Sequence, residues 1–125
     1  MKRSYSKPGP AGNLFDIIEN AERIAQYLAS TNYADFKSNF LLRDAVERCM
    51  ERVCEAALRL GNRAAELMPN QPWNDIRGMG NRLRHAYDRI DVAVVWQSAT
   101  QDIPALVADA RQALAELAAK NDDLT

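Results

Sequence analysis

One run of apolar residues limits what this chain can fold into more than any other feature of its sequence. Its members are spaced alternately four and three positions apart, which returns them to one side of an α-helix. The pattern predicts a long helix over 35–60 whose apolar seam packs in a helical bundle. The charged residues between the seam positions are predicted to form a solvated outer face, with opposite charges about one turn apart. The seam consists of Leu42, Val46, Cys49, Val53, Ala56 and Leu60, and the charged face of Arg43, Glu47, Arg48, Glu51, Arg52 and Glu55.

Shorter versions of this spacing occur on both sides of the seam. They predict helices over 14–30, 73–88, 92–99 and about 102–119, with a turn at 30–34 and a short helical turn at 62–68. These elements together predict an all-α fold, a four- to five-helix up-and-down bundle. Residues suited to helix ends lie at the boundaries. We expect Asn13 to cap the first helix, Gly61 to end the long one, Asp91 to cap the next to last, and Asp102 with Pro104 to begin the last.

Length and composition fit one domain. The chain has 125 residues, 47% of them hydrophobic, which is enough for a real core. Pro8, Gly9, Pro10 and Gly12 predict a flexible leader over 1–12, before a single helical domain over 13–120 and a frayed tail over 121–125. The net charge of −1 means that any contact with RNA must come from a local patch.

The chain lacks the sequence signals of a membrane or secreted protein. No apolar run approaches the roughly 18 to 20 residues needed to span a bilayer. No apolar segment follows the first residues, so no secretory signal is visible. We therefore expect a cytoplasmic protein with no membrane partner.

The two cysteines and the single histidine do not form a recognisable metal site. Cys49 and Cys54 are five positions apart, so on a helix they point in different directions and are not expected to form a disulfide. Both are interpreted as small buried apolar residues in a reducing compartment. The sequence predicts no metal ion and no cofactor.

The helix predicted over 73–88 carries the best candidate for a functional site. At about 100° per residue, Ile76, Met79 and Leu83 fall within one apolar arc. The only histidine, His85, falls on the opposite side, with Asn81 near it. This polar face is either a solvated basic surface or one wall of a site. The arginines on or beside it are Arg77, Arg82, Arg84 and Arg89.

Short motifs along nearly the whole folded chain resemble the HepT-like branch of the HEPN superfamily. The resemblance covers roughly 14–115, and the motifs are specific when taken together. They are Ala-Val-Glu-Arg at 45–48, Glu-Ala-Ala at 55–57, Pro-Trp at 72–73, Ile-x-Gly-Met-x-Asn-x-Leu-x-His-x-Tyr at 76–87, Ile-Asp at 90–91, Val-Trp at 95–96 and Asp-Ile-Pro-Ala-Leu at 102–106.

This resemblance implies a helical bundle that forms a homodimer and acts as the toxin of a type VII toxin–antitoxin pair. The implied antitoxin is a minimal nucleotidyltransferase of the MntA kind. Family members that act as toxins are metal-independent endoribonucleases, with a motif of Arg, four or more residues, His and often x-Tyr. The motif makes His85 the catalytic histidine, Asn81 the polar residue behind the arginine, and Tyr87 the side chain to which the antitoxin transfers AMP. The helical position of Tyr87 is equally compatible with packing beside the apolar arc.

The sequence departs from this motif at one position. Gly80 stands where the family has its arginine, which removes a fixed cation from the place where a phosphate would be held. Arg77, Arg82 and Arg84 lie within about one turn and are candidate replacements. Because helical side chains lean toward the N-terminus, Arg84 is predicted to lay its guanidinium over the space left by Gly80.

These residue types suit RNA cleavage without a metal ion. That reaction needs a base for the ribose 2′-OH, a cation for the charged phosphorane and a group that protonates the 5′-oxygen. Histidine suits the proton transfers near neutral pH, and arginine offers forked donors to phosphate oxygens. Asn81, one turn from His85, suits contact with the phosphate or the ring, and a symmetric dimer would supply a second proton carrier.

Two functions therefore stay open. The first is a HEPN ribonuclease toxin. The second is a helical binding module that keeps the dimer and the antitoxin surface without cleaving RNA, because Gly80 replaces the arginine. Trp73 and Trp96 are interpreted as core anchors and not as stacking surfaces for RNA bases.

Overall fold

The computed structural model describes residues 9–85 and 90–124, and every regular element among them is helical. The prediction of an all-α fold is confirmed. The elements are α1 (Pro10–Leu28), α2 (Tyr33–Ser38), α3 (Phe40–Leu60), α4 (Arg63–Leu67), α5 (Trp73–His85), α6 (Val92–Gln97), a π-helical segment η1 (Ser98–Asp102) and α7 (Ile103–Leu124).

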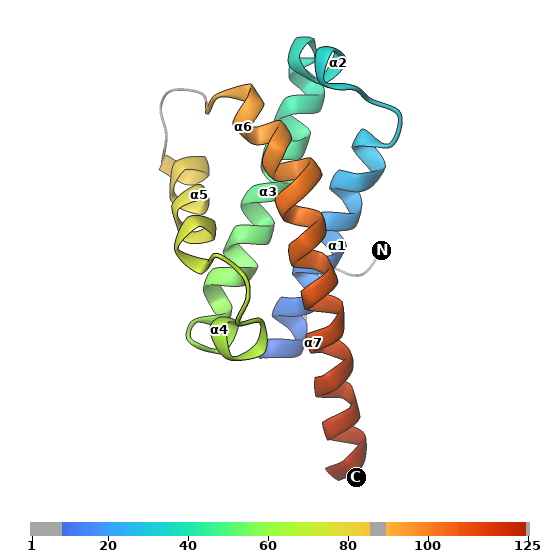
Figure 1. Ribbon diagram of the computed structural model, residues 1–125, viewed down its shortest axis with the longest axis vertical. Coiled ribbons are helices and arrows are strands. Elements are labelled where there is room, and N and C mark those ends of the chain that lie inside the picture. The colour runs from blue at the N-terminus through green and yellow to red at the C-terminus, as the bar shows by residue number, and fades with distance from the viewer. Residues whose placement is uncertain (1–8, 86–89, 125) are drawn as a thin grey trace.

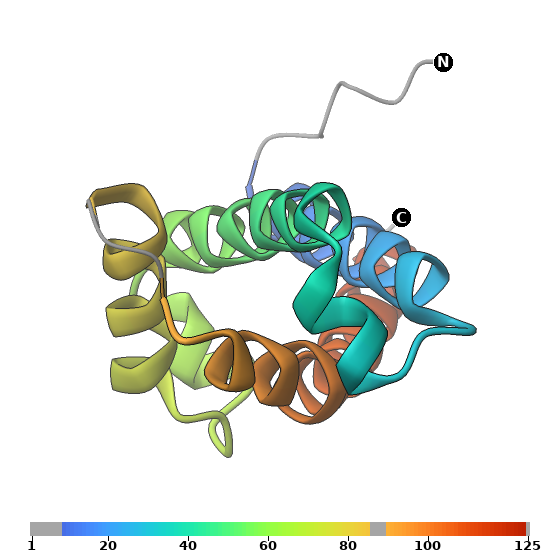
Figure 2. The same cartoon turned by 90° about the horizontal axis from the view of Figure 1, so that it is seen from above.

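The four long helices run alternately up and down, as Figure 1 shows. Helix α1 packs on α3 and on α7, while α5 packs mainly on α3. The spatial order is therefore α5, α3, α1, α7, so α5 is an outer helix. Viewed from above, α1 and α3 lie side by side in one layer, and α6 continues into α7 in another (Figure 2). The up-and-down bundle that the apolar spacing predicts is the observed arrangement.

The apolar seam of α3 forms the centre of the core. Val46, Met50 and Val53 have no exposed surface, and they pack with buried side chains of α1 and α7. Burying side chains of this size contributes roughly 1.5–3 kcal/mol each to stability. The partners of the seam include Leu14, Ile17, Ile24, Leu106 and Ala110.

The first helix begins earlier than predicted. Helix α1 starts at Pro10, after Gly9 in a positive-φ conformation (86°), so residues 10–12 belong to the helix and not to a leader. Proline favours the first turn because its missing N–H has no partner there in any case. Asn13 therefore lies inside α1 and does not cap it.

The long helix predicted over 35–60 is broken at Asn39. This residue adopts an extended conformation, and its side chain accepts a hydrogen bond (3.0 Å) from the backbone N–H of Leu42, which caps α3. Asparagine competes with helical hydrogen bonds in this way, so the apolar spacing alone could not reveal the break. The helical turn predicted at 62–68 is confirmed as α4.

The last helix does not restart at Asp102. The chain continues from α6 through η1 into α7, which extends to Leu124 instead of fraying from Asn121. Pro104 lacks a backbone N–H, and its ring would clash with the carbonyl one turn earlier in a regular α-helix. The wider π-helical turn just before it accommodates the proline without a break.

Several local predictions are confirmed. Gly61 ends α3 with a φ of 57°, and the Asp91 carboxylate caps α6 by accepting from the Ala93 N–H at 2.9 Å. Cys49 and Cys54 are buried and unpaired. The prediction for Arg43 was wrong, because its side chain is buried and donates to the Lys37 carbonyl (3.2 Å) instead of lying on a solvated face.

The two tryptophans lie at the core, as interpreted. Trp73 is buried, and the Trp96 ring contacts the rings of Phe36 and Tyr33, with centroid separations of 5.3 and 5.9 Å. None of the helices described here is long and apolar enough to cross a membrane.

Candidate functional site

Helix α5 carries the predicted site residues, and its first residue fixes it on the bundle. The Trp73 indole N–H donates to the Met68 carbonyl (2.9 Å), and the Trp73 side chain is buried. Ile76, Met79 and Leu83 then turn their partly buried side chains toward the core. This places the opposite side of α5 at the surface, as its apolar arc predicts.

At Gly80, α5 packs tightly against Cys54 of α3. A Cβ atom placed on Gly80 would lie 2.9 Å from Cys54 Cβ, which is closer than such atoms approach in proteins. Gly78, half a turn earlier, has nothing within 4 Å. The missing side chain at position 80 therefore permits this helix contact, and an arginine there would require α5 to move away from α3.

The guanidinium of Arg84 covers Gly80. Its Nη1 atom lies 3.3 Å from the position that a Gly80 Cβ would occupy, and 3.5 Å from Glu55 Oε1 on α3. Its Nη2 atom donates to Asn81 Oδ1 at 2.9 Å. The Arg84 side chain is only 23% exposed, and its Nη1 atom is buried without a hydrogen-bond partner among the described residues, so these contacts hold a cation in one place between α5 and α3.

The same contact orients Asn81. Its amide oxygen accepts from Arg84, and its amide N–H₂ donates to none of the residues that the structure describes, which leaves it for another acceptor. Arg77, one turn earlier, donates from Nη2 to Asn74 Oδ1 at 2.6 Å. These side chains line a small pocket of about 130 Å³ between α5 and α3. Its lining consists of Cys54, Leu58, Arg77, Gly80, Asn81 and Arg84.

This small pocket brings together part of the predicted site. Arg77, Asn81 and Arg84 line it, whereas Arg82 and His85 are exposed and lie outside it. His85 is the last residue of α5, one turn beyond Asn81. Tyr87 lies outside the residues that the structure describes. Among the described residues that line it, the pocket has two arginines and no acid, so it suits an anion such as a phosphate group.

Cys54 is a structural part of this pocket. Burial raises the pKa of its thiol to about 11, although the Arg84 charge acts in the opposite direction. Burial also raises the pKa of Cys49. A thiol in this state is a poor nucleophile at neutral pH, so Cys54 serves here as the small residue against which Gly80 packs.

Sequence reasoning missed Glu55 as part of the site. It was assigned to a solvated face, but its carboxylate lies between Arg84 (3.5 Å) and Arg59 (3.7 Å). Only the packing of α5 on α3 brings residues 55 and 84 together, so no local signal could have identified the pair. The proximity of Cys54 to Gly80 was hidden for the same reason.

The amino-acid sequence matches one family of proteins over most of its length. Residues 17–113 match the family model for HepT-like ribonucleases, and the chain belongs to that family. No solved structure shows a significant match to the chain.

Curated relatives agree with this assignment. A Thermococcus cleftensis protein named "Probable ribonuclease HepT" is 34% identical over 106 residues, which cover 85% of this chain and 92% of the relative. A Methanocaldococcus jannaschii protein named "Putative RNase MJ1380" is 34% identical over 91 residues, 73% of this chain and 84% of the relative. The resemblance inferred from the short motifs is thereby confirmed at the level of the family.

Proposed function

We propose that this protein is a metal-independent endoribonuclease, with His85 as its acid and base and Arg84 as the cation that binds the scissile phosphate. The observation that best supports this proposal is the position of Arg84. Its guanidinium covers the residue that replaces the family arginine, and it contacts Asn81, one turn from the exposed His85.

The proposed reaction is an attack of the ribose 2′-oxygen on the adjacent phosphorus. A histidine accepts the 2′-OH proton, the P–O5′ bond breaks, and a protonated group donates a proton to the 5′-oxygen. The products are a 2′,3′-cyclic phosphate and a 5′-hydroxyl. Arg84 and the free N–H₂ of Asn81 would stabilise the charge on the phosphorane, and such preorganised donors each contribute roughly 10²–10³-fold to a rate.

Glu55 supports this arrangement by holding Arg84 in place. The pair is partly exposed, with side-chain exposures of 23% for Arg84 and 38% for Glu55, so its own contribution to stability is small. Its value lies in orientation, because a guanidinium fixed before the substrate arrives need not be ordered during the reaction. Arg77 and Arg82 would then provide weaker contacts to neighbouring phosphates.

We propose that the active form is a homodimer. One α5 carries one histidine, whereas the reaction moves two protons, and a two-fold axis would place a second His85 opposite the first. The exposure of His85 at the end of an outer helix is consistent with such a shared site. Each protomer would also contribute its Arg84 and Asn81 to the cleft.

We also propose that the protein is a toxin that acts in the cytoplasm and is silenced by a nucleotidyltransferase antitoxin of the MntA kind. The proposed modification is transfer of AMP to the hydroxyl of Tyr87. This residue is two positions beyond His85 in the sequence, so a bulky anion there would oppose the approach of RNA. The support for these roles is the family to which the chain belongs.

The test is RNA cleavage by the full chain in the presence of a chelator. A labelled single-stranded RNA should be cut by the wild type to products with 2′,3′-cyclic phosphate ends, and His85→Ala should abolish the cut. Expression should arrest growth, and co-expression of a cognate nucleotidyltransferase of the MntA kind should restore it. Equal cleavage by the wild type and His85→Ala would reject the assignment of His85.

A second candidate function is a binding module that keeps the partner surfaces without cleaving RNA. Gly80 favours this candidate, since the family arginine is absent. The two candidates differ in one assay. A binding module would form the dimer and bind the nucleotidyltransferase, yet would neither cut RNA nor arrest growth.

A further inference from the structure

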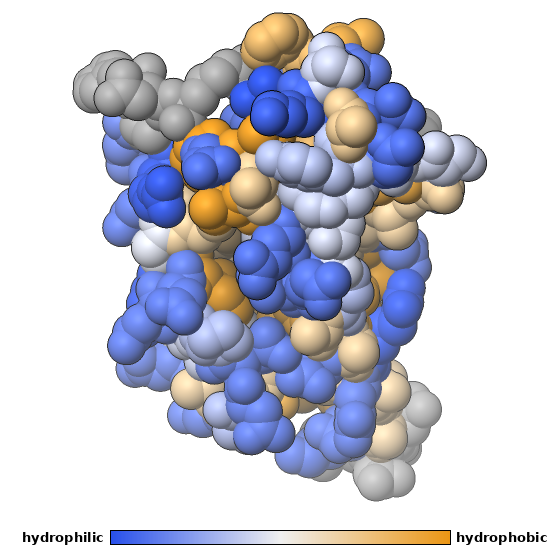
Figure 3. Space-filling model, turned by 45° about the horizontal axis from the view of Figure 1, so that its top comes forward, coloured by the Kyte–Doolittle hydropathy of each residue, from blue (hydrophilic) through white to orange (hydrophobic). Residues whose placement is uncertain are grey.

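A larger cavity lies on the other side of α5, between this helix, α3 and the η1–α7 segment. Its volume is about 320 Å³, at the lower end of the range typical of small-molecule sites. Helix α5 packs mainly on α3, so the cavity fills the space where α5 faces α7. On the face seen in Figure 3, apolar side chains are visible in a hollow flanked by polar ones.

The floor of this cavity is apolar and adaptable. Met50 and Val53 of α3 are fully buried, and Leu106 of α7 is nearly so. Ile76 and Met79 enter from α5 and are partly buried. Thioether side chains can adjust to ligands of different shape, which suits this floor to the apolar part of a small molecule.

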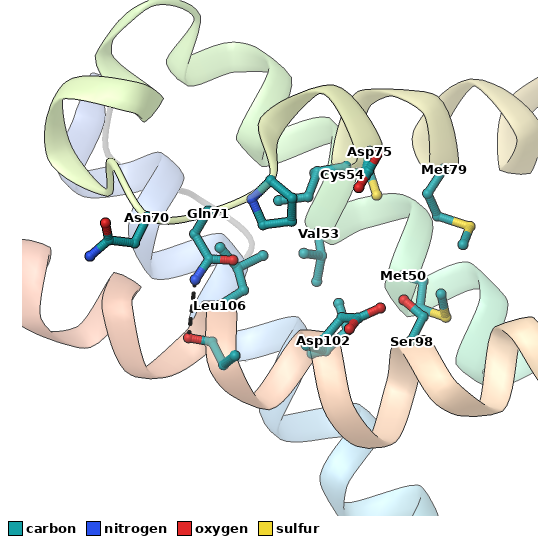
Figure 4. A pocket seen from close by; sticks show the side chains of 14 residues that line it. Met50, Val53, Cys54, Asn70, Gln71, Asp75, Met79, Ser98, Asp102 and Leu106 are labelled. Atoms are coloured by element: carbon teal, nitrogen blue, oxygen red, sulfur yellow. Dashed lines mark hydrogen bonds between the residues drawn. The ribbon is translucent and has the colours of Figure 1, made fainter.

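Several polar groups around the cavity offer hydrogen-bond acceptors. Gln71 donates its amide N–H₂ to Asp109 Oδ2 (2.8 Å), so its amide oxygen remains for a ligand. Asp75 and Asp102 add two carboxylates from opposite walls, as Figure 4 shows. None of the described residues that line the cavity is basic.

Ser98 offers a hydroxyl to this cavity. Ser98 is only 7% exposed and lines the cavity from η1, yet its hydroxyl makes no hydrogen bond to any residue that the structure describes. Its oxygen is not one of the fully buried unpartnered atoms of the described residues, so it is accessible from the cavity and available for a hydrogen bond with a ligand. Ser98 and Asp102 both belong to the π-helical turn, and such turns are frequent at functional sites.

We propose that this cavity binds a small molecule with an apolar body and a protonated amine head. The body would lie on Met50 and Met79, and the amine would donate to the Asp75 and Asp102 carboxylates and to Ser98. Two carboxylates, with no basic residue among the described lining, disfavour phosphates, so this ligand differs in class from RNA. The inference does not depend on the proposed ribonuclease activity.

Such a ligand would also bridge α5 to α7. Because α5 packs mainly on α3, a molecule held between Asp75 and Asp102 adds a second attachment to this helix. We therefore expect slower opening of α5 when the cavity is filled. Because Asn81 and Arg84 also belong to α5, a ligand in the cavity would affect how firmly these two side chains are held. It would do so without contacting a ligand in the small pocket.

The experiment uses full-length protein labelled with ¹³C at the methionine methyl groups, titrated with 4-phenylbutylamine. The chain has four methionines, and Met68 is a built-in control because it lies outside this cavity. The methyl signals of Met50 and Met79 should shift and saturate, with Met68 unchanged. Amide exchange over 73–85 should slow at saturation. The matched acid, 4-phenylbutyrate, should bind at least tenfold more weakly.

Variants locate the site. Ala105→Phe should abolish the shifts by filling the cavity, while Ala108→Phe, one turn along the exposed side of α7, should leave them unchanged.

Asp75→Asn and Asp102→Asn should each weaken binding about two- to fivefold, as expected for exposed ion pairs. The absence of shifts at Met50 and Met79, equal binding of the acid, or unchanged binding to Ala105→Phe would each overturn the proposal. Binding that leaves amide exchange in α5 unchanged would overturn the proposal that the ligand bridges α5 to α7.

Discussion

The two sides of α5 differ in charge, although one short helix forms both. One side presents Arg77, Asn81 and Arg84 to a pocket of about 130 Å³. The other presents Asp75 and Met79 to a cavity of about 320 Å³. Cys54 of α3 lines both, so a single buried residue separates a place suited to an anion from a place suited to a cation. The difference shows that the position of α5 on α3 decides the chemistry on both sides.

The contact between Gly80 and Cys54 fixes that position. Because a Cβ on Gly80 would lie 2.9 Å from Cys54 Cβ, the helices can approach this closely only with a glycine at position 80. Arg84 gains its place over Gly80 as a result.

The largest effect is expected from His85. His85→Ala should lower the rate of RNA cleavage by about 10²–10⁴-fold, the usual contribution of a group that transfers protons in the transition state. Since His85 is exposed, the variant should keep the unfolding midpoint of the wild type. Cleavage rates and thermal unfolding of the same preparations check both statements. If the variant cleaved RNA at the wild-type rate, His85 would have no part in the reaction, and the arginine-bearing side of α5 could not be assigned as the active site.

Arg84 should come next. Arg84→Ala should reduce the cleavage rate by about 10²-fold or more, because it removes a preorganised donor to the transition state. The matched control is Arg59→Ala, since Arg59 shares the Glu55 partner (3.7 Å) but does not line the small pocket. Arg59→Ala should change the rate less than twofold. Equal losses in the two variants would mean that Arg84 acts only through the general surface charge.

The two glycines of α5 should respond in opposite directions. Gly80→Ala should destabilise the fold by about 1–3 kcal/mol, since an extra methyl group there overpacks the contact with Cys54. Gly78→Ala should stabilise it by about 0.5–1 kcal/mol, since it gains helix propensity in open space. Urea unfolding of both variants measures the difference. Similar changes in both would show that α5 is not held closely on α3.

Removing the Glu55 charge should have a smaller effect. In Glu55→Gln the Arg84 guanidinium loses its ionic partner at 3.5 Å, and we expect the cleavage rate to fall by about fivefold, the factor that corresponds to roughly 1 kcal/mol. Arg84→Lys should lose more than Glu55→Gln, because lysine lacks the forked donors. Kinetics at low and high salt check this, since the Glu55 effect should shrink as salt screens the pair.

The pH dependence of stability should show the burial of Cys54. The pKa of its thiol is about 11 in the folded protein against 9.0 for an ordinary cysteine, so the unfolded chain releases its proton first as the pH rises. The stability that Cys54 contributes is therefore complete below pH 9 and is lost toward pH 11. The difference in unfolding free energy between the wild type and Cys54→Ala should narrow by on the order of 1 kcal/mol over this range. A constant difference would contradict the burial of the thiol.

The fold could be predicted largely from apolar spacing, because helices with one apolar stripe must pack their stripes together. The seam from Leu42 to Leu60 and the arc from Ile76 to Leu83 are both found where the spacing places them. The predicted helix boundaries are wrong where backbone hydrogen bonding overrides the pattern of apolar residues. Asn39 breaks a continuous stripe by capping α3, and η1 carries the chain past Pro104 without a break.

The candidate site could be predicted only in part. The exposure of His85 and the identity of the polar face follow from positions within one helix. The pairing of Arg84 with Glu55 and the contact of Gly80 with Cys54 join residues that are more than 25 positions apart. Their proximity depends on how α5 packs on α3, which no local pattern encodes.

The most direct test of the account is to locate RNA on the two sides of α5. A short RNA with 2′-O-methyl groups, which cannot be cleaved, can be titrated into protein labelled at asparagine side-chain amides, the histidine ring and methionine methyl groups. The account predicts shifts at Asn81 and His85 and none at Met50 or Met79. Shifts at Met50 and Met79, with Asn81 and His85 unchanged, would contradict it.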